Sequence, residues 1–158
     1  MKTIIGIDPG VTGSLAVILP DNSIRIFDLP TAQTDGFTGI DPIEFYRLLI
    51  EIKGVSECVA YCEKSILPPG NGKMTTRSIY DCRGVIRTAL ALKNIPLKYV
   101  PPGTWKKFHG IPAGSDKEYS RGLAKQIRPD ISEQLARKKD HNRAEAVLIA
   151  LYGQNREK

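Results

Sequence analysis

The chain has 158 residues, the length of one domain with a hydrophobic core of ordinary size. Its net charge of +6 and pI of about 9.3 point to a polyanionic partner such as a nucleic acid. No stretch approaches the roughly 20 apolar residues of a membrane span, and the N-terminus lacks the pattern of a secretory signal. We therefore expect no membrane partner.

The positive charge is concentrated in the C-terminal part of the chain. Residues 1–95 hold ten basic and ten acidic residues, whereas residues 96–158 hold thirteen and seven. An even spread would suit a merely solvated surface, so the concentration favours a binding surface. The three cysteines, Cys58, Cys62 and Cys82, form no C-x-x-C pair, which favours reduced thiols and a cytoplasmic location over a disulfide framework or a zinc site.

The first predicted element is a strand that ends in the turn of Thr3–Gly13 (TIIGIDPGVTG). The β-favouring residues stop at Asp8, and the following proline and glycines turn the backbone. An ionised carboxylate at the end of a buried strand needs a partner, and Mg²⁺ prefers such oxygens. The alternative is an Asp that only caps the turn.

The rest of the chain alternates further strands with helices. We expect strands at Ser14–Leu19 and Ser23–Leu29, a loop at 30–41, and a helix at Pro42–Ile52 with Asp41 as its N-cap. A strand at Cys58–Cys62 that ends at Glu63, a loop at Ile66–Thr76, a helix at Arg77–Lys93 and a strand at Leu97–Val100 should follow. The last predicted elements are a helical turn at Trp105–Phe108, a helix at Ser115–Ile127 with Ser115 and Glu118 as a capping box, and a helix at Asp140–Tyr152.

This order predicts an α/β fold and a single domain over residues 1–158. An antiparallel meander of three strands followed by crossovers to parallel strands gives a mixed five-stranded sheet flanked by helices. Asp8 ends the first strand and Glu63 ends the fourth, so both carboxylates emerge at the sheet edge where open α/β sheets bind ligands.

The last helix brings further acidic residues to this edge. Glu145 lies between Ala144 and Ala146, small residues that allow a helix to approach a sheet closely. Asp140 begins the same helix, where it either caps the backbone or reaches a metal. His141 and Asn142 are alternative ligands, and His141 is otherwise a solvated first-turn residue. For Glu63 and Glu145 the alternative is a surface charge.

Three or four carboxylates without a thiolate or imidazole cluster form a hard-oxygen site. Such a site selects Mg²⁺ or Mn²⁺ over Zn²⁺. It suits phosphoryl transfer to water with two ions, one activating the water and one stabilising the leaving oxygen. We therefore expect the metal ligands among Asp8, Glu63, Asp140, His141 and Glu145, with two ions at the site.

Four motifs together resemble RuvC-type Holliday junction resolvases, which belong to the RNase H-like superfamily. They are GIDPGVTG, CVAYCEK, TWKKFHGIPAGSDKE and DHNRAEAVLIAL, and they cover the chain in the family's order. The resemblance implies an RNase H-like fold and an Mg²⁺-dependent endonuclease that nicks four-way junctions. It places the catalytic set on Asp8, Glu63, Asp140, Glu145 and Lys117. The family often has a second Asp where this chain has Asn142, so the fourth ligand stays open among Asp140, His141 and Asn142.

The resemblance also implies contacts with branched DNA and a homodimer. The predicted DNA-binding residues are Lys106, Lys107, Lys117, Arg121 and Lys125. The helix Arg77–Lys93 is the family's dimer interface, although Ile79, Ile86 and Leu90 could instead all face the sheet. Family members carry a wedge in the loop after the catalytic Glu, and Ile66, Leu67 and Met74 are the candidates here. Trp105 is expected in the core.

Three rival functions remain. The D-x-G-x-T-G turn also occurs in sugar and acetate kinases, but those need a second domain that 158 residues do not supply. A less selective nuclease acting on branched DNA or RNA–DNA hybrid shares the acidic set. A non-catalytic nucleic-acid-binding domain would keep the basic surface alone. Nicking of a synthetic junction compared with linear duplex and hybrid separates these possibilities.

Overall fold

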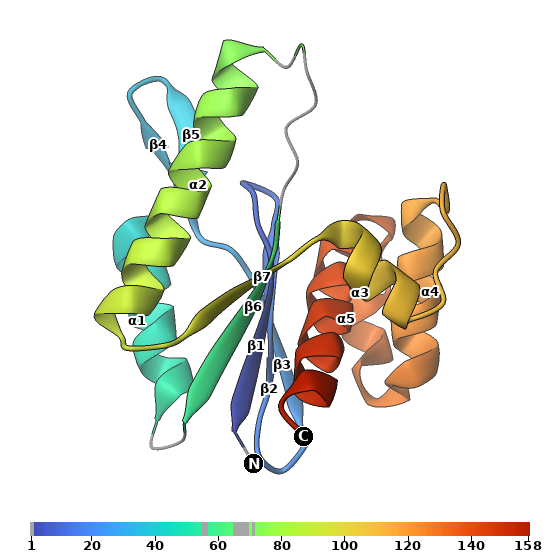
Figure 1. The fold of residues 1–158 in the computed structure, drawn as a ribbon. Helices are drawn as coiled ribbons and strands as arrows, with labels where there is room; N and C mark the ends of the chain where they lie inside the picture. The colour runs from blue at the N-terminus through green and yellow to red at the C-terminus, as the bar shows by residue number, and fades with distance from the viewer. Residues whose placement is uncertain (1, 55–56, 65–69, 71) are drawn as a thin grey trace.

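The centre of the structure is a five-stranded mixed sheet (Figure 1). The computed structural model describes residues 2–54, 57–64, 70 and 72–158. The strand order is β3-β2-β1-β6-β7, with strands β1 (Thr3–Asp8), β2 (Ser14–Ile18), β3 (Ile24–Asp28), β6 (Cys58–Glu63) and β7 (Leu97–Val100). β1 pairs antiparallel with β2 and parallel with β6, so the mixed sheet expected from the sequence is confirmed.

Helices cover both faces of the sheet, which explains why its central strands β1, β2 and β6 are apolar on both sides. One face is covered by α1 (Pro42–Lys53) and α2 (Lys73–Leu92). The other is covered by α5 (His141–Arg156), with α3 (Pro102–Phe108) and α4 (Lys117–Ile127) beside it (Figure 1). We call these two sides the α2 face and the α5 face.

Alternation along the strands decides which side each side chain takes. Ile5 and Ile7 of β1 pack in the core of the α2 face, whereas Ile4 packs in the core of the α5 face. Asp8 therefore shares the α5 side with Ile4. The same alternation on β6 puts Cys62 on the α2 face and Glu63 on the α5 face.

Helix α5 lies unusually close to β1 because the contact residues are small. A Cβ added at Gly6 would overlap the backbone of Ala146 and Ala150. Ala146 and Ala150 are themselves fully buried. Close approach of this helix brings its N-terminal turns to the strand ends that carry the acidic residues.

The segment 30–41, predicted to be a loop, instead contains a β-hairpin. Strands β4 (Thr31–Thr34) and β5 (Phe37–Ile40) pair antiparallel and form a separate two-stranded sheet. Asp35 and Gly36 join them with φ of 46° and 78°. Positive φ at both positions is what an Asp-Gly hairpin turn requires, so the prediction of a loop was wrong despite a signal in the sequence.

Several helix boundaries also differ from the prediction. α2 begins at Lys73, so residues 73–76 are helical and not part of a loop, while Ile66 and Leu67 lie outside the described residues. The predicted capping box at Ser115 is wrong, because Asp116 caps α4 by accepting from the Tyr119 backbone N–H at 2.9 Å. α5 runs to Arg156, beyond the predicted end.

Two short 3₁₀ segments that the sequence did not predict connect α4 to α5. They are η1 (Pro129–Leu135) and η2 (Lys138–Asp140). Within the described part of the chain, every helix is too short or too polar to cross a lipid bilayer.

Candidate active site

Asp8, Glu63 and Glu145 come together on the α5 face from three distant parts of the chain. β1 and β6 are parallel neighbours with Ile7 opposite Cys62, so the next residues along, Asp8 and Glu63, end adjacent strands. Glu145 lies in the second turn of α5, which packs on β1. The negative charges of Glu145 and Glu63 both act on the Asp8 carboxyl.

The Asp8 carboxyl is held in conditions that disfavour its charge. Burial is the largest cause and raises its pKa well above the ordinary value, and the charges of Glu145 and Glu63 raise it further. Lys117 and Lys106 oppose this rise. Among the described residues, the Asp8 carboxylate has no hydrogen bond or ion pair. A cation bound at this point would offset both the cost of burying the charged carboxylate and its repulsion by Glu145 and Glu63.

Glu63 is positioned by the indole of Trp105. The Trp105 Nε1–H donates to Glu63 Oε2 at 2.9 Å, and Trp105 itself is fully buried on α3. Burial raises the pKa of Glu63, the indole hydrogen bond lowers it, and the charge of Glu145 raises it again. The sequence indicated only a core position for Trp105, since no local pattern reveals a hydrogen bond between residues 42 positions apart.

Glu145 has polar partners on α3 and α4. Its Oε1 lies 3.8 Å from Lys106 Nζ and accepts from Ser120 Oγ at 3.4 Å. Lys106, Ser120 and Glu145 line a cavity of about 630 Å³ between α3 and α4, which Lys107 and Lys117 also line. The cavity therefore has basic walls and a carboxylate at one side.

Lys117 stands at the start of α4, where two cavities meet. Its Nζ lies 3.1 Å from His141 Nε2, and His141 Nδ1 lies 3.3 Å from the Lys138 carbonyl oxygen. A second cavity of about 560 Å³ is lined by Lys117 and His141 together with Lys138 and Lys139. His141 is thus beside the predicted phosphate-contacting lysine.

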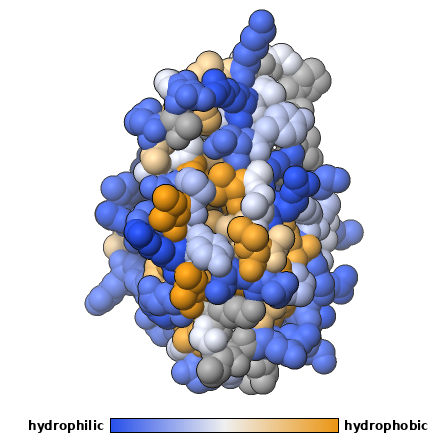
Figure 2. All heavy atoms as spheres, turned by 90° about the vertical axis from the view of Figure 1, so that its left-hand side faces the viewer, coloured by the Kyte–Doolittle hydropathy of each residue, from blue (hydrophilic) through white to orange (hydrophobic). Residues whose placement is uncertain are grey.

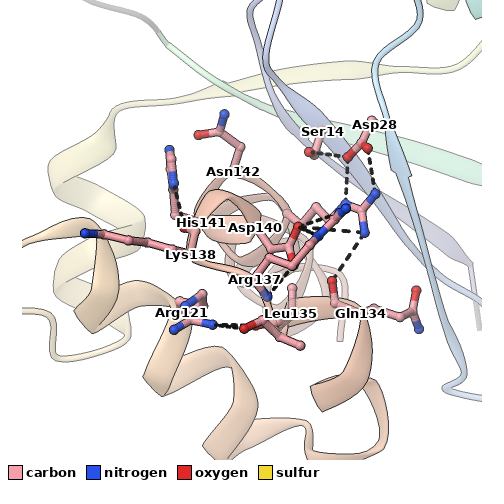
Figure 3. Close-up of polar contacts among 12 residues, drawn as sticks. Ser14, Asp28, Arg121, Gln134, Leu135, Arg137, Lys138, Asp140, His141 and Asn142 are labelled. Atoms are coloured by element: carbon pink, nitrogen blue, oxygen red, sulfur yellow. Dashed lines mark hydrogen bonds and ion pairs between the residues drawn. The ribbon is translucent and has the colours of Figure 1, made fainter.

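The structure does not bring Asp140 to the other acids. Its carboxylate accepts from the Arg137 backbone N–H at 2.8 Å and pairs with the Arg137 guanidinium at 2.8 Å (Figure 3). Arg143 lies 4.0 Å away and also pairs with Asp28. Burial disfavours the charged form of Asp140, but the hydrogen bonds and charge of Arg137 outweigh it and hold the pKa below its ordinary value.

Both carboxylate oxygens of Asp140 are thus engaged by Arg137, which disfavours the predicted role of Asp140 as a metal ligand. The side chain of Asn142 is also engaged, because its Nδ2 donates to the Thr12 carbonyl oxygen and Thr12 Oγ1. This contact ties the first turn of α5 to the turn that follows Asp8. The sequence could not decide whether Asp140 or Asn142 is a ligand, because it does not reveal their hydrogen-bond and ion-pair partners.

The predicted DNA-binding residues divide into two groups. Lys106, Lys107 and Lys117 line the cavity beside Glu145. Arg121 instead donates to the carbonyl oxygens of Leu135 and Ala136 at 2.8 Å and pairs with Glu118. Because its side chain is only 13% exposed, Arg121 holds α4 against η1 and is poorly available to a phosphate. Lys125 lies in the last turn of α4, away from this cavity.

In the described residues, no three His, Cys, Asp or Glu side chains stand in an arrangement that could hold a metal ion as they are. The donor chemistry nevertheless fits a hard divalent ion, since the acids that lie nearest one another are carboxylates. The observation that most favours a cation here is the half-buried Asp8 carboxylate with its two acidic neighbours. Carboxylates whose negative charges are not balanced by a cation repel one another, and this repulsion opposes a closer arrangement.

Comparison with known proteins shows similarity in structure but not in sequence. No protein-family model matches the chain, and no curated protein matches it. A Thermus thermophilus RuvC structure matches with a TM-score of 0.58 and 17% identity, covering 97% of this chain and 96% of that one. T. thermophilus RuvC in complex with a Holliday junction substrate matches with a TM-score of 0.59 and 17% identity, covering 98% and 96%.

These matches span nearly the whole chain, so its fold is that of RuvC. The RNase H-like α/β class expected from the sequence is confirmed.

Proposed function

We propose that this protein is a divalent-metal-dependent endonuclease that nicks four-way DNA junctions. The observation that carries the proposal is the meeting of Asp8, Glu63 and Glu145 on the α5 face of a RuvC-like fold. A basic domain without nuclease activity has no need of a half-buried carboxylate whose pKa is raised by desolvation and by two other acids.

Asp8, Glu63 and Glu145 would hold the Mg²⁺ or Mn²⁺ ions, and we propose two ions per site. Bound ions would supply charge stabilisation for the transferring phosphoryl group and an activated water at neutral pH. His141 stays a candidate for a further ligand or for proton transfer. As a ligand, its Nε2 would have to exchange the Lys117 ammonium group, 3.1 Å away, for the ion.

The chain's own residues prepare the site for a phosphodiester. Trp105 fixes the Glu63 carboxylate by its indole N–H. Lys106 and Lys117 lie close enough to affect the charge of Asp8, so their ammonium groups stand where the developing negative charge of the phosphate needs compensation. Lys107 extends this basic wall, and binding should weaken as salt is added.

A homodimer would match the two-fold symmetry of a four-way junction. Ile86 and Leu90 of α2 face the core, so they are not interface residues. The surface between α1 and α2 nevertheless gathers apolar side chains (Figure 2). A groove of about 740 Å³ lies there, lined among others by Ile43, Ile50 and Leu92, which are 62%, 50% and 67% exposed. We propose that a second copy of the chain covers this groove.

Met74 is the one predicted wedge residue within the described residues. It lies in the first turn of α2 and is 54% exposed. An exposed apolar side chain of this kind can separate stacked bases at a branch point. We keep Met74 as the candidate wedge, and Ile66 and Leu67 remain predictions outside the described residues.

Nicking of three labelled substrates tests the proposed function. A synthetic four-way junction, a linear duplex of the same sequence and an RNA–DNA hybrid are incubated with Mg²⁺ or with a chelator. We expect nicking of the junction alone, and only with Mg²⁺. Equal cleavage of the hybrid or of linear duplex would favour the less selective nuclease instead.

Asp8→Asn is the matched variant for this assay. It removes a carboxylate of the proposed site and leaves the basic surface unchanged. We expect junction binding within about twofold of wild type and a loss of nicking of at least about 10²-fold, comparable with the loss of a preorganised catalytic group. Undiminished nicking by the purified variant would refute the assignment.

A further inference from the structure

A separate cavity lies on the α2 face, on the opposite side of the sheet from Glu145. Its volume is about 310 Å³. Residues of α2 and β7 and the residue after β6 line it: Lys64, Tyr80, Arg83, Gly84, Arg87 and Tyr99. None of the three proposed metal-binding acids and none of the lysines discussed above belongs to this lining.

Strand alternation and helix periodicity explain why these side chains meet. Lys64 follows Glu63 and takes the same side of the sheet as Cys62, and Tyr99 of β7 pairs with Cys62. On α2, Tyr80, Arg83 and Arg87 repeat at helical spacing and form one stripe. The two elements thus face each other with cationic and aromatic groups.

Gly84 opens the floor of this cavity. A Cβ built at Gly84 meets no heavy atom within 4 Å. Glycine in a helix interior costs roughly 0.5–1 kcal/mol relative to alanine, and no close backbone contact explains its presence here. Gly84 also lines the apolar groove between α1 and α2, so it borders both surfaces.

The lining combines three cations with two accessible phenol rings. Tyr80 and Tyr99 are 58% and 42% exposed, and the Arg83 guanidinium lies 6.0 Å from the Tyr80 ring centroid. Among the described residues, no acidic side chain lines the cavity. Cations that contact phosphates beside aromatic rings that stack on bases are the combination used to bind single-stranded nucleic acid.

We propose that this cavity is a subsite for one nucleotide of an unpaired DNA strand. The base stacks on Tyr99 or Tyr80, and Lys64, Arg83 and Arg87 contact its phosphates. The proposal rests on the proposed function, because it takes DNA as the substrate. It adds a base-contacting site on the face of the sheet that the nuclease chemistry does not use.

The position of Lys64 connects this subsite to the candidate active site. Glu63 and Lys64 are consecutive, so their side chains point to opposite faces at the same end of β6. A strand whose backbone is bound at the carboxylates can therefore pass the end of the sheet and place a neighbouring unpaired nucleotide in the cavity. Unpaired nucleotides are available at a branch point but not in linear duplex.

Amide chemical shifts report binding here without any cleavage. The ¹⁵N-labelled protein is titrated with tetradeoxythymidylate and, separately, with inorganic phosphate, both in the presence of a chelator. We expect the oligonucleotide to shift the amides of Tyr80, Gly84, Arg87 and Tyr99. Inorganic phosphate should bind at least about tenfold more weakly at these amides, because it offers no base to stack.

Exposed side chains provide variants that should not disturb folding. Tyr99→Ser should weaken oligonucleotide binding about tenfold, whereas Tyr99→Phe keeps the ring and should bind as wild type does. Arg87→Glu should also weaken binding about tenfold or more. Arg156→Glu makes the same charge change at the exposed C-terminal end of α5, at the opposite end of the sheet. It is the matched control and should leave these shifts unchanged.

Three outcomes would overturn the proposal. They are an absence of shifts at the cavity, equal binding of inorganic phosphate and oligonucleotide, and equal binding by Tyr99→Ser and Tyr99→Phe. If the junction is nicked but the cavity shows no shifts, the subsite fails while the nuclease stands. If the expected shifts occur but no DNA is nicked with Mg²⁺, the subsite stands and the proposed function fails.

Discussion

At the scale of the residue, the acidic side chains differ in whether they contact basic groups. Asp8 is half-buried near other acids without an ion pair among the described residues, whereas Asp140 is buried in a set of arginine contacts. The pKa of Asp8 is raised and the pKa of Asp140 is lowered. Opposite shifts in two acids that were both predicted as metal ligands argue for a binding role for one and a structural role for the other.

Asp140→Asn should therefore destabilise the fold without removing the metal site. Losing the charge leaves the partly buried Arg143 with Asp28 as its remaining acidic partner, and we expect a loss of about 1–3 kcal/mol in the free energy of unfolding at pH 7. Urea denaturation measures this loss. Asp130→Asn, which removes an exposed carboxylate paired with Arg128, is the control and should cost less than about 1 kcal/mol.

The loss of stability caused by Asp140→Asn should become smaller as the pH falls. Because the folded state lowers the pKa of Asp140, its stabilisation is fully present above the unfolded-state value of about 3.9 and is lost as the pH falls through the lower folded value. The difference between wild type and variant should shrink at about pH 3. A variant of normal stability that no longer binds Mn²⁺ would instead make Asp140 a ligand.

The sequence predicted the acidic set well and the neighbours of each acid poorly. Strand ends and alternation are local properties, so the amino-acid pattern is enough to place Asp8 and Glu63 on one edge of the sheet. The hydrogen bond from Trp105 to Glu63 and the arginine contacts of Asp140 depend on how α3 and η2 pack. These contacts depend on tertiary packing, so no pattern in a single sequence reveals them.

At the scale of the element, the packing of α5 on β1 positions the site. Glu145 reaches the sheet edge because Gly6 allows Ala146 and Ala150 to come close. The small residues on the helix could be recognised in the sequence, but the matching glycine on the strand could not. Similarly, the Asp35-Gly36 hairpin was missed because the flanking strands have only four residues each.

Gly6→Ala should move α5 away from the sheet. The added methyl group overlaps helix backbone, which cannot yield as a flexible side chain can, so we expect a loss of about 2–3 kcal/mol or more in the free energy of unfolding. Nicking should fall as well, since Glu145 moves with the helix. Denaturant unfolding and the junction assay measure the two effects.

Gly122→Ala is the control for this substitution. Gly122 lies inside α4, and a Cβ there meets nothing within 4 Å. This substitution should stabilise the protein by about 0.5–1 kcal/mol. Comparable stability of the two variants would contradict the close approach of α5.

At the scale of the whole molecule, the apolar groove and the basic cavities beside the candidate active site lie on different sides of the sheet. Two basic cavities flank α3 and α4 beside the α5 face. The apolar groove lies between α1 and α2 (Figure 2), and the smaller cavity with Lys64, Arg83 and Arg87 borders it on α2. The sequence predicted the basic C-terminal part directly from composition. It could not predict the groove, because helical spacing alone does not tell whether Ile43 and Ile50 are covered.

Ile50→Glu should disrupt the proposed dimer. A charge placed in an apolar interface remains desolvated, so we expect the dissociation constant to rise at least about tenfold. Sedimentation equilibrium measures it. Ile127→Glu introduces the same charge at an isoleucine of similar exposure on α4 and should leave association unchanged. A wild-type protein that is monomeric at all concentrations would refute the dimer.

The central claim is that Asp8, Glu63 and Glu145 share divalent ions. Anomalous X-ray diffraction from crystals soaked in Mn²⁺ tests it most directly, at about pH 8, so that the raised pKa of Asp8 does not leave the carboxyl protonated. We predict Mn²⁺ within about 2.0–2.3 Å of oxygens of Asp8 and at least one of the other two acids. Mn²⁺ bound only elsewhere, or no ion at these three side chains at millimolar Mn²⁺, would contradict the account.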